Sequence, residues 1–222
     1  VFSLDDAVEK WLPEFKGVRV QGRSEPAKPP LIWQLLSHRS GLPGNDDRGA
    51  VRMRSGPPPA LADAVAGWAK AGLLAEPGTR FAYGNAGYVT MSRIAEVATG
   101  RRFETLMQET LLDPLGMSRT TFRPSGEDLK AVPRRYRRTT EGLRPEPGSY
   151  PVPGPDEWVN PAGGLFSTLD DLGRFLSMHL RGGKAGGRQI VSAGHLARMA
   201  ARACLTAASS PVGAEERLRG GS

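Results

Sequence analysis

The stretch FAYGNAGY, residues 81–88, holds the residue types in this sequence that are best suited to acid–base chemistry. Tyr83 and Asn85 lie two residues apart, and a phenol beside a carboxamide can transfer a proton and orient an amide or ester group. A tyrosine with its ordinary pKa of about 10 is a poor base at neutral pH unless cationic groups stabilise the phenolate. The same residues also suit a turn before a helix, and the pattern taken alone favours that structural interpretation.

Other patterns for nucleophilic catalysis are missing or weak. No serine has glycine at both flanking positions, as the nucleophile elbow of an α/β-hydrolase requires. His38 lies between Ser37 and Ser40, but residues so close in sequence rarely form a nucleophile–base pair. We therefore predict that His38 is structural and hydrogen-bonded under a turn. His179 is predicted to pack or to cap a helix, and His195 to lack a partner.

Metal and cofactor sites are not predicted either. The three histidines are separated, and the single cysteine, Cys204, sits in an alanine-rich segment, so no zinc-binding spacing exists. The glycines of residues 182–187 lack the Ser or Thr of a phosphate-binding loop and indicate a turn. The expected cofactor content is none.

Composition places the chain among soluble globular proteins. Its 222 residues are 39% hydrophobic and 24% charged, which suits one domain or one lobe of a larger domain. No apolar run is long enough for a membrane span, and the start at Val1 shows neither an initiator Met nor a leader. The sequence therefore looks like an internal piece, and it predicts no particular compartment.

The net charge of +7 raises nucleic acid as a partner. The densest basic cluster, RRYRR at residues 134–138, follows Pro133 and precedes a Pro- and Gly-rich stretch. A basic helix face or interleaved aromatics would suit nucleic acid better, so the cluster is predicted to be a solvated loop and nucleic acid is not an expected partner.

Apolar periodicity predicts a chain made mainly of helices. Helices are expected after Pro30 until Ser40-Gly41, from Leu61 to Gly72, over the stretch before Gly100, from Phe103 to Pro114 and Gly116, and over residues 169–180 with Leu172, Phe175 and Leu176 inward. Thr168 and Asp171 resemble a helix-capping pair, and only a brief strand is indicated at Val18–Val20. Residues 43–59 and 123–161 are predicted loops within one domain, 1–199, and residues 200–222 are predicted to be a poorly ordered tail.

Three stretches in a fixed order resemble the serine β-lactamase-related family. They are LIWQLLSHRSGLPG, then EPGTRFAYGNAGYVTMSRIAEVATG and its continuation to TTF, then NPAGGLFSTLDDLGRFLSMHLRGG. The family includes class C β-lactamases, D-Ala-D-Ala carboxypeptidases of the penicillin-binding protein class, D-aminopeptidases and esterases. The resemblance covers residues 2–195 and implies an α+β fold of the β-lactamase/transpeptidase type. This chain would hold mainly the helical lobe, with most of the sheet missing.

The resemblance implies catalytic roles for Tyr83 and Asn85. In the family, the serine of a Ser-x-x-Lys motif attacks a carbonyl carbon, and the lysine and the tyrosine of a Tyr-x-Asn motif handle the proton. Tyr83 would be the general base and acid, and Asn85 would contact the substrate amide and orient the lysine. The expected partner is a small-molecule or peptide substrate.

Two departures from the family pattern limit that implication. No serine in the sequence is followed by lysine three residues on. The third family motif, Lys/His-x-Gly on a strand, is also predicted to be missing, since residues 195–197 read His-Leu-Ala. The chain alone is therefore expected to form no acyl-enzyme and to expose apolar helix faces that favour self-association. The alternative is a non-catalytic ligand-binding or interaction protein built on the same lobe.

Overall fold

Helices dominate the computed structural model of the chain, which describes residues 2–44, 60–145 and 152–200. The strands within these ranges form two separate two-stranded antiparallel sheets, β1–β2 and β3–β4. The elements, in chain order, are η1 (Val8–Lys10), η2 (Pro13–Phe15), α1 (Ile32–Leu36), α2 (Leu61–Ala71), α3 (Ala86–Thr99), α4 (Phe103–Met107), the π-helical turn η3 (Gln108–Leu112), α5 (Asp113–Leu115), α6 (Gly126–Ala131), β1 (Tyr136–Thr139), β2 (Gly142–Pro145), α7 (Leu169–Leu180), β3 (Lys184–Ala185), β4 (Arg188–Gln189) and α8 (Ala193–Ala200).

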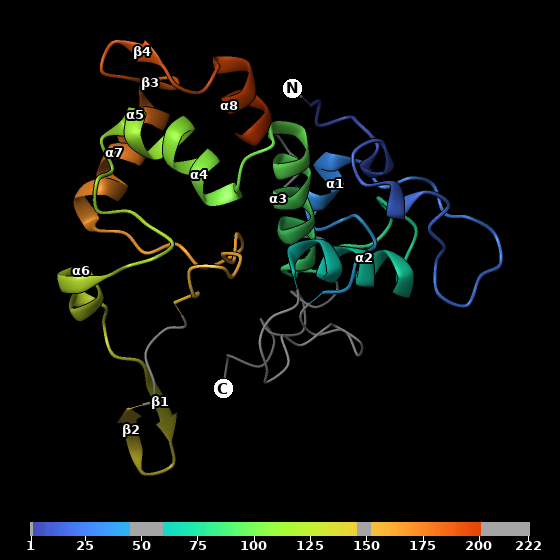
Figure 1. Ribbon diagram of the computed structural model, residues 1–222, viewed down its shortest axis with the longest axis horizontal. Coiled ribbons are helices and arrows are strands. Elements are labelled where there is room, and N and C mark those ends of the chain that lie inside the picture. The colour runs from blue at the N-terminus through green and yellow to red at the C-terminus, as the bar shows by residue number, and fades with distance from the viewer. Residues whose placement is uncertain (1, 45–59, 146–151, 201–222) are drawn as a thin grey trace, which may run out of the picture.

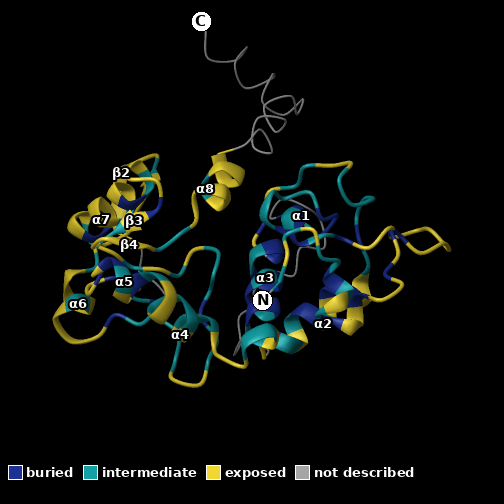
Figure 2. Ribbon diagram, turned by 90° about the horizontal axis from the view of Figure 1, so that it is seen from above, coloured by how far each residue is buried: buried dark blue, intermediate teal, exposed yellow. Residues whose placement is uncertain are grey.

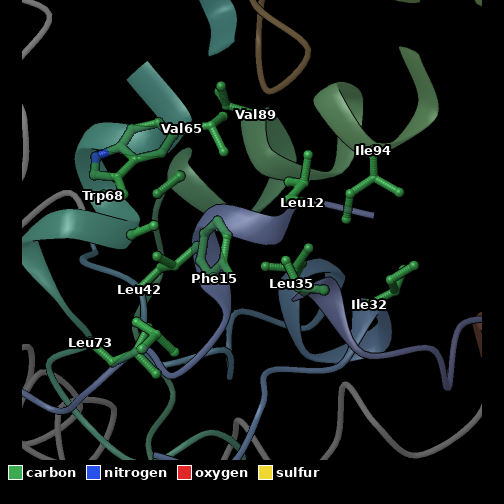
Figure 3. Close-up of a cluster of buried hydrophobic side chains, with 14 of the residues drawn as sticks. Leu12, Phe15, Ile32, Leu35, Leu42, Val65, Trp68, Leu73, Val89 and Ile94 are labelled. Atoms are coloured by element: carbon green, nitrogen blue, oxygen red, sulfur yellow. The ribbon is translucent and has the colours of Figure 1, made fainter. Parts of the chain in front are cut away.

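The first group of helices, α1 to α3, packs around one core (Figures 1 and 3). Its central side chains include Phe15 of η2, Leu35 of α1, Val65 of α2 and Ile94 of α3, all of which are fully buried. Burying each such side chain stabilises the fold by about 1.5–3 kcal/mol. This core fixes the start of α3, which the FAYGNAGY stretch enters.

The boundaries of α2 and α3 follow the sequence prediction closely, whereas α1 ends at Leu36 and the predicted stop at Ser40-Gly41 is wrong. Gly72 follows the last residue of α2, and Gly100 follows α3 in the left-handed conformation expected of a C-terminal cap. The predicted strand at Val18–Val20 is reduced to isolated bridges, Arg19 with Pro26 and Val20 with Leu73. A regular strand does not form there within the described residues.

The second group comprises α4, η3, α5 and α7, around a smaller core of Leu112, Leu115, Met117 and Met178. The predicted end at Pro114 and Gly116 is confirmed at Gly116, which follows Leu115 in the left-handed conformation, while Pro114 lies within α5. Proline is tolerated there because it is in the first turn of α5.

Asp171 ties α7 to the segment that follows α5. Its carboxylate is 1% exposed and accepts hydrogen bonds from Thr120 Oγ1 at 2.8 Å and from the Arg119 N–H at 2.9 Å. Arg174 pairs with it at 2.5 Å. The predicted capping pair is also present, since the Asp171 N–H donates to Thr168 Oγ1 at 3.3 Å. α7 is thereby anchored at its first turn.

α7 carries a second apolar face that no described part of the chain covers. Phe175 packs against the second core as predicted, but the prediction that Leu172 and Leu176 also point inward is wrong. The leucine face of α7, which consists of Leu169, Leu172, Leu176 and Leu180, has exposed fractions of 87%, 45%, 59% and 89%. Figure 2 shows this helix largely in the exposed colour. A helix that is apolar on opposite sides is typical of one buried on both sides.

The predicted loop at residues 123–161 contains regular structure. α6 and the antiparallel hairpin β1–β2 lie within it, and in Figure 1 the hairpin extends away from the helices. The basic cluster 134–138 therefore overlaps a strand, β1, and the prediction of a loop is wrong there, although its residues are exposed as expected. Most of the predicted loop 43–59 and nearly all of the predicted tail 200–222 lie outside the described residues.

Candidate active site

Tyr83 and Asn85 lie on the turn that leads into α3, and both are exposed. The Tyr83 side chain is 60% exposed. Asn85 is the residue before α3, and its main-chain carbonyl accepts the Val89 N–H at 3.0 Å while its side chain does not cap the helix. The two residues thus finish a turn before a helix, as the structural interpretation of the pattern expects, and the Asn85 carboxamide does not cap that helix.

This turn is held by the segment that follows α1. Three main-chain carbonyls of the segment, those of His38, Arg39 and Gly41, accept N–H groups from Ala82, Gly78 and Leu74 at 2.9, 2.7 and 2.8 Å. The two segments thus run side by side in opposite directions. The stretches SHRSGLPG and EPGTRFAYGN, far apart in the sequence, form one unit.

His38 contacts the turn with its side chain as well. Its Nδ1 accepts a hydrogen bond from the Gly84 N–H at 3.4 Å, and its ring centroid lies 4.8 Å from that of Tyr83. Tyr88 of α3 lies on the ring too, with centroids 5.4 Å apart, and donates its hydroxyl to the Leu36 carbonyl at 3.2 Å. The prediction of a structural His38 under a turn is confirmed.

The imidazole of His38 is held in its neutral form. Burial lowers the pKa of His38 below the ordinary histidine value, because the charged ring loses solvation. The Gly84 hydrogen bond also needs an unprotonated Nδ1, which places the ring proton on Nε2. His38 is therefore an acceptor toward the Tyr83 turn.

Gly44, further along the segment that follows α1, also lies against the turn. A β-carbon at this position would lie 2.8 Å from the Tyr83 carbonyl oxygen, closer than such contacts occur. Only glycine lets this main chain lie against Tyr83. The GLPG sequence therefore shapes the surroundings of the turn.

The other histidines lie elsewhere in the fold. The His179 ring packs on Phe175, with centroids 4.6 Å apart, as predicted. The prediction that His195 has no partner is wrong. Its Nδ1 lies 2.9 Å from Ser192 Oγ, which also accepts the His195 N–H and so caps the first turn of α8.

The letters Lys-x-Gly do occur in the sequence, at Lys184-Ala185-Gly186, which the prediction of a missing motif did not consider. Residues 184–185 form the two-residue strand β3, which pairs with β4 and packs against α7 in the second group. The contacts of β3 that the structure shows are with β4, α7 and the second core.

Two surface hollows on the described part of the chain lie away from Tyr83. One is small and lined by residues of α2, α3 and α4 together with Trp158, and the other is an open groove along residues 14–23 and 69–72. Among the described residues no cluster of His, Cys, Asp or Glu could hold a metal ion. Within the same ranges no helix is long and apolar enough to cross a membrane.

The sequence matches the family described as "Beta-lactamase" over residues 1–219. "Beta-lactamase-like protein 4" of Dictyostelium discoideum is 31% identical over 190 residues, which are 81% of this chain and 31% of that protein. "Penicillin-binding protein 4" of Amycolatopsis lactamdurans is 32% identical over 203 residues, which are 88% of this chain and 49% of that protein. A putative β-lactamase of Bacteroides dorei has a similar structure, with a TM-score of 0.62 at 32% identity over 91% of this chain and 50% of that one.

The chain thus spans half the length of these relatives or less, from 31% to 50%. The words β-lactamase-like and penicillin-binding in these names describe the relatives themselves.

Proposed function

The chain belongs to the serine β-lactamase-related family, and we propose that its Tyr83 turn forms one half of an acyl-transfer site for amide or ester bonds. Tyr83 accepts the proton of a serine hydroxyl as the serine oxygen bonds to the carbonyl carbon, and returns a proton to the leaving amine or alcohol. Asn85 donates from its carboxamide to the substrate and orients it. Water then releases the acyl group from the serine by the reverse proton path.

The observation that carries this proposal is the combination of exposure and rigid support at Tyr83. The phenol is 60% exposed, while the main-chain N–H groups of the residues on both sides of it, Ala82 and Gly84, are hydrogen-bonded to His38. A tyrosine that only filled a turn would gain by burying its ring. A proton-transfer group needs instead a fixed backbone and an accessible hydroxyl.

The nucleophile has to come from outside these 222 residues, since none of their serines has lysine three positions on. A lysine beside the phenol is also what would make Tyr83 a base at neutral pH. The chain alone is therefore expected to lack the covalent route and most of its rate enhancement. The substrate class is an amide or ester, in the range from β-lactams to D-amino-acid peptides and simple esters.

Intact-mass spectrometry after incubation with a fluorophosphonate probe and, separately, with a penicillin tests this proposal. The chain alone should show no stoichiometric adduct. A polypeptide extended upstream through a Ser-x-x-Lys segment should become labelled on that serine. A stoichiometric adduct on the 222-residue chain would show that one of its own serines is activated and would overturn the assignment of the nucleophile.

The absence of Ser-x-x-Lys from the sequence also suits a second function, ligand binding without turnover. Calorimetry with a penicillin and with a D-Ala-D-Ala peptide separates the two. Saturable binding to the chain, with no labelling of the extended polypeptide, would favour the binding protein over the hydrolase.

A further inference from the structure

His38 accepts hydrogen bonds from the main-chain N–H groups of both sequence neighbours of Tyr83. Its main-chain carbonyl accepts the N–H of Ala82, at 2.9 Å, and its side-chain Nδ1 accepts the N–H of Gly84, at 3.4 Å. These two donors belong to the residues immediately before and after Tyr83. One residue therefore restrains the backbone on either side of the phenol.

The ring of His38 also restrains the Tyr83 side chain. The two ring centroids are 4.8 Å apart, with an angle of 49° between the ring planes. Phe81 and Tyr88 contact the same imidazole, at 5.7 and 5.4 Å between centroids, so the imidazole lies among three aromatic side chains. Aromatic pairs at such separations add stabilisation beyond that of buried area.

The backbone of His38 is bent into an unusual conformation to make these contacts. Its φ of 57° makes it the one residue other than glycine with positive φ among the described residues. A side chain in this region is strained and persists where the surrounding structure over-determines it, often at functional sites. Glycine at position 38 would avoid that strain, but it would lose the Nδ1 that accepts the Gly84 N–H and the ring that contacts Tyr83.

We propose that His38 is a positioning residue for Tyr83, which fixes the phenol for proton transfer only while its imidazole is neutral. This inference rests on the proposed function solely in naming Tyr83 as the proton-transfer group. When Nδ1 takes up a proton, it can no longer accept from Gly84, and two N–H groups then face each other. The turn loosens and the ring of Tyr83 changes its surroundings.

The titratable groups that contact the His38 ring are the phenols of Tyr83 and Tyr88, one from the turn and one from α3. A histidine with a lowered pKa takes up its proton at a pH below the ordinary histidine value. We assign the transition in this range to His38, because its Nδ1 is the acceptor of the Gly84 N–H. Arg39, the next residue in the chain, is the charged neighbour of His38 in the sequence.

Fluorine NMR of the 222-residue chain labelled with 3-fluorotyrosine tests the proposal. The Tyr83→Phe variant identifies the Tyr83 resonance by its loss. In the unmodified chain this resonance should shift in a single step as the pH falls below the ordinary histidine pKa. In His38→Gly, which keeps the backbone conformation and removes the ring, the step should vanish and the Gly84 amide should exchange about tenfold faster.

His179→Ala, which removes a different imidazole, should leave the step unchanged and serves as the matched control. A Tyr83 resonance that shows no step in the unmodified chain, or keeps its step in His38→Gly, would overturn the proposal. If His38→Gly fails to fold, the titration of the unmodified chain still decides the matter. None of these readouts depends on acylation, so failure of the positioning role is distinguishable from failure of the proposed hydrolase function.

Discussion

Gly87, in the first turn of α3, lies directly against the main-chain carbonyl of Leu35 in α1. A β-carbon on Gly87 would be 2.5 Å from that oxygen, a distance that real β-carbons do not show. The two helices therefore meet backbone to backbone, just after the Tyr83 turn. This contact determines where α3 starts relative to the segment that carries His38.

Gly87→Ala should therefore destabilise the fold. The added methyl group meets backbone and not a flexible side chain, so the helices must separate, at a cost of about 2 kcal/mol in the free energy of unfolding. The measurement is urea unfolding followed by circular dichroism. Gly67→Ala on α2 is the control, since a β-carbon there meets nothing within 4 Å, and it should raise stability by about 0.5–1 kcal/mol. Equal effects of the two substitutions would contradict the close approach.

Because of Asp171, the stability of the second group of helices should decrease as the pH falls into the acid range. Burial alone raises the pKa of this carboxyl, but hydrogen bonds from Thr120, the Arg119 N–H and Arg174 outweigh it and lower the pKa below the ordinary value. The stability contributed by the carboxylate is then fully present above the ordinary carboxyl pKa. It is lost as the pH falls through the lowered pKa.

Asp171→Asn should lower the free energy of unfolding by about 2 kcal/mol at neutral pH and flatten its decline in acid. Thermal unfolding recorded across the acid range checks both effects. Asp170→Asn, at the neighbouring exposed position, should change stability by less than about 1 kcal/mol. If the free energy of unfolding falls as steeply with decreasing pH in Asp171→Asn as in the unmodified chain, other carboxyl groups are responsible for the decline.

The leucine face of α7 predicts concentration-dependent self-association of the chain. Leu176, at the centre of this face, is 59% exposed. Burying the face against a second copy of the chain would remove several leucine side chains from water. Leu176→Gln should weaken association about tenfold in sedimentation velocity. Leu143→Gln on β2 is the control, because that leucine is 66% exposed but lies outside the face. A chain that stays monomeric at every concentration would refute the prediction.

The sequence predicted the helices well where apolar periodicity and glycine agree. α2 and α3 begin and end near the predicted residues, because Gly72 and Gly100 follow them directly. The same reasoning was right that Gly116 ends the helix after Pro114. It was wrong for Leu172 and Leu176, which periodicity alone cannot assign to a covered or an uncovered side. The expected β-lactamase/transpeptidase-like fold, with mainly helices and little sheet, is confirmed by the described structure and its structural relatives.

The site could be predicted only in part. Tyr83 and Asn85 were indicated by their chemistry and by family resemblance, and their catalytic roles stay predictions. The link between His38 and the peptide units around Tyr83 spans more than 40 residues of sequence, for example 46 between His38 and Gly84, and no local pattern encodes it. The only sequence signal was a histidine enclosed by serines before Gly41, which predicted a structural role but not which turn it would support.

The rate of acylation tests the assignment of Tyr83 most directly. The polypeptide extended upstream through a Ser-x-x-Lys segment would be mixed with a fluorogenic ester, and the burst of acyl-enzyme would be recorded for the unmodified protein and for Tyr83→Phe. Removing the phenolic hydroxyl should slow acylation at least about 100-fold while the fold and its thermal unfolding stay unchanged. An equal acylation rate in the two proteins would show that Tyr83 does not transfer the proton, and the FAYGNAGY turn would then have no part in the acid–base chemistry.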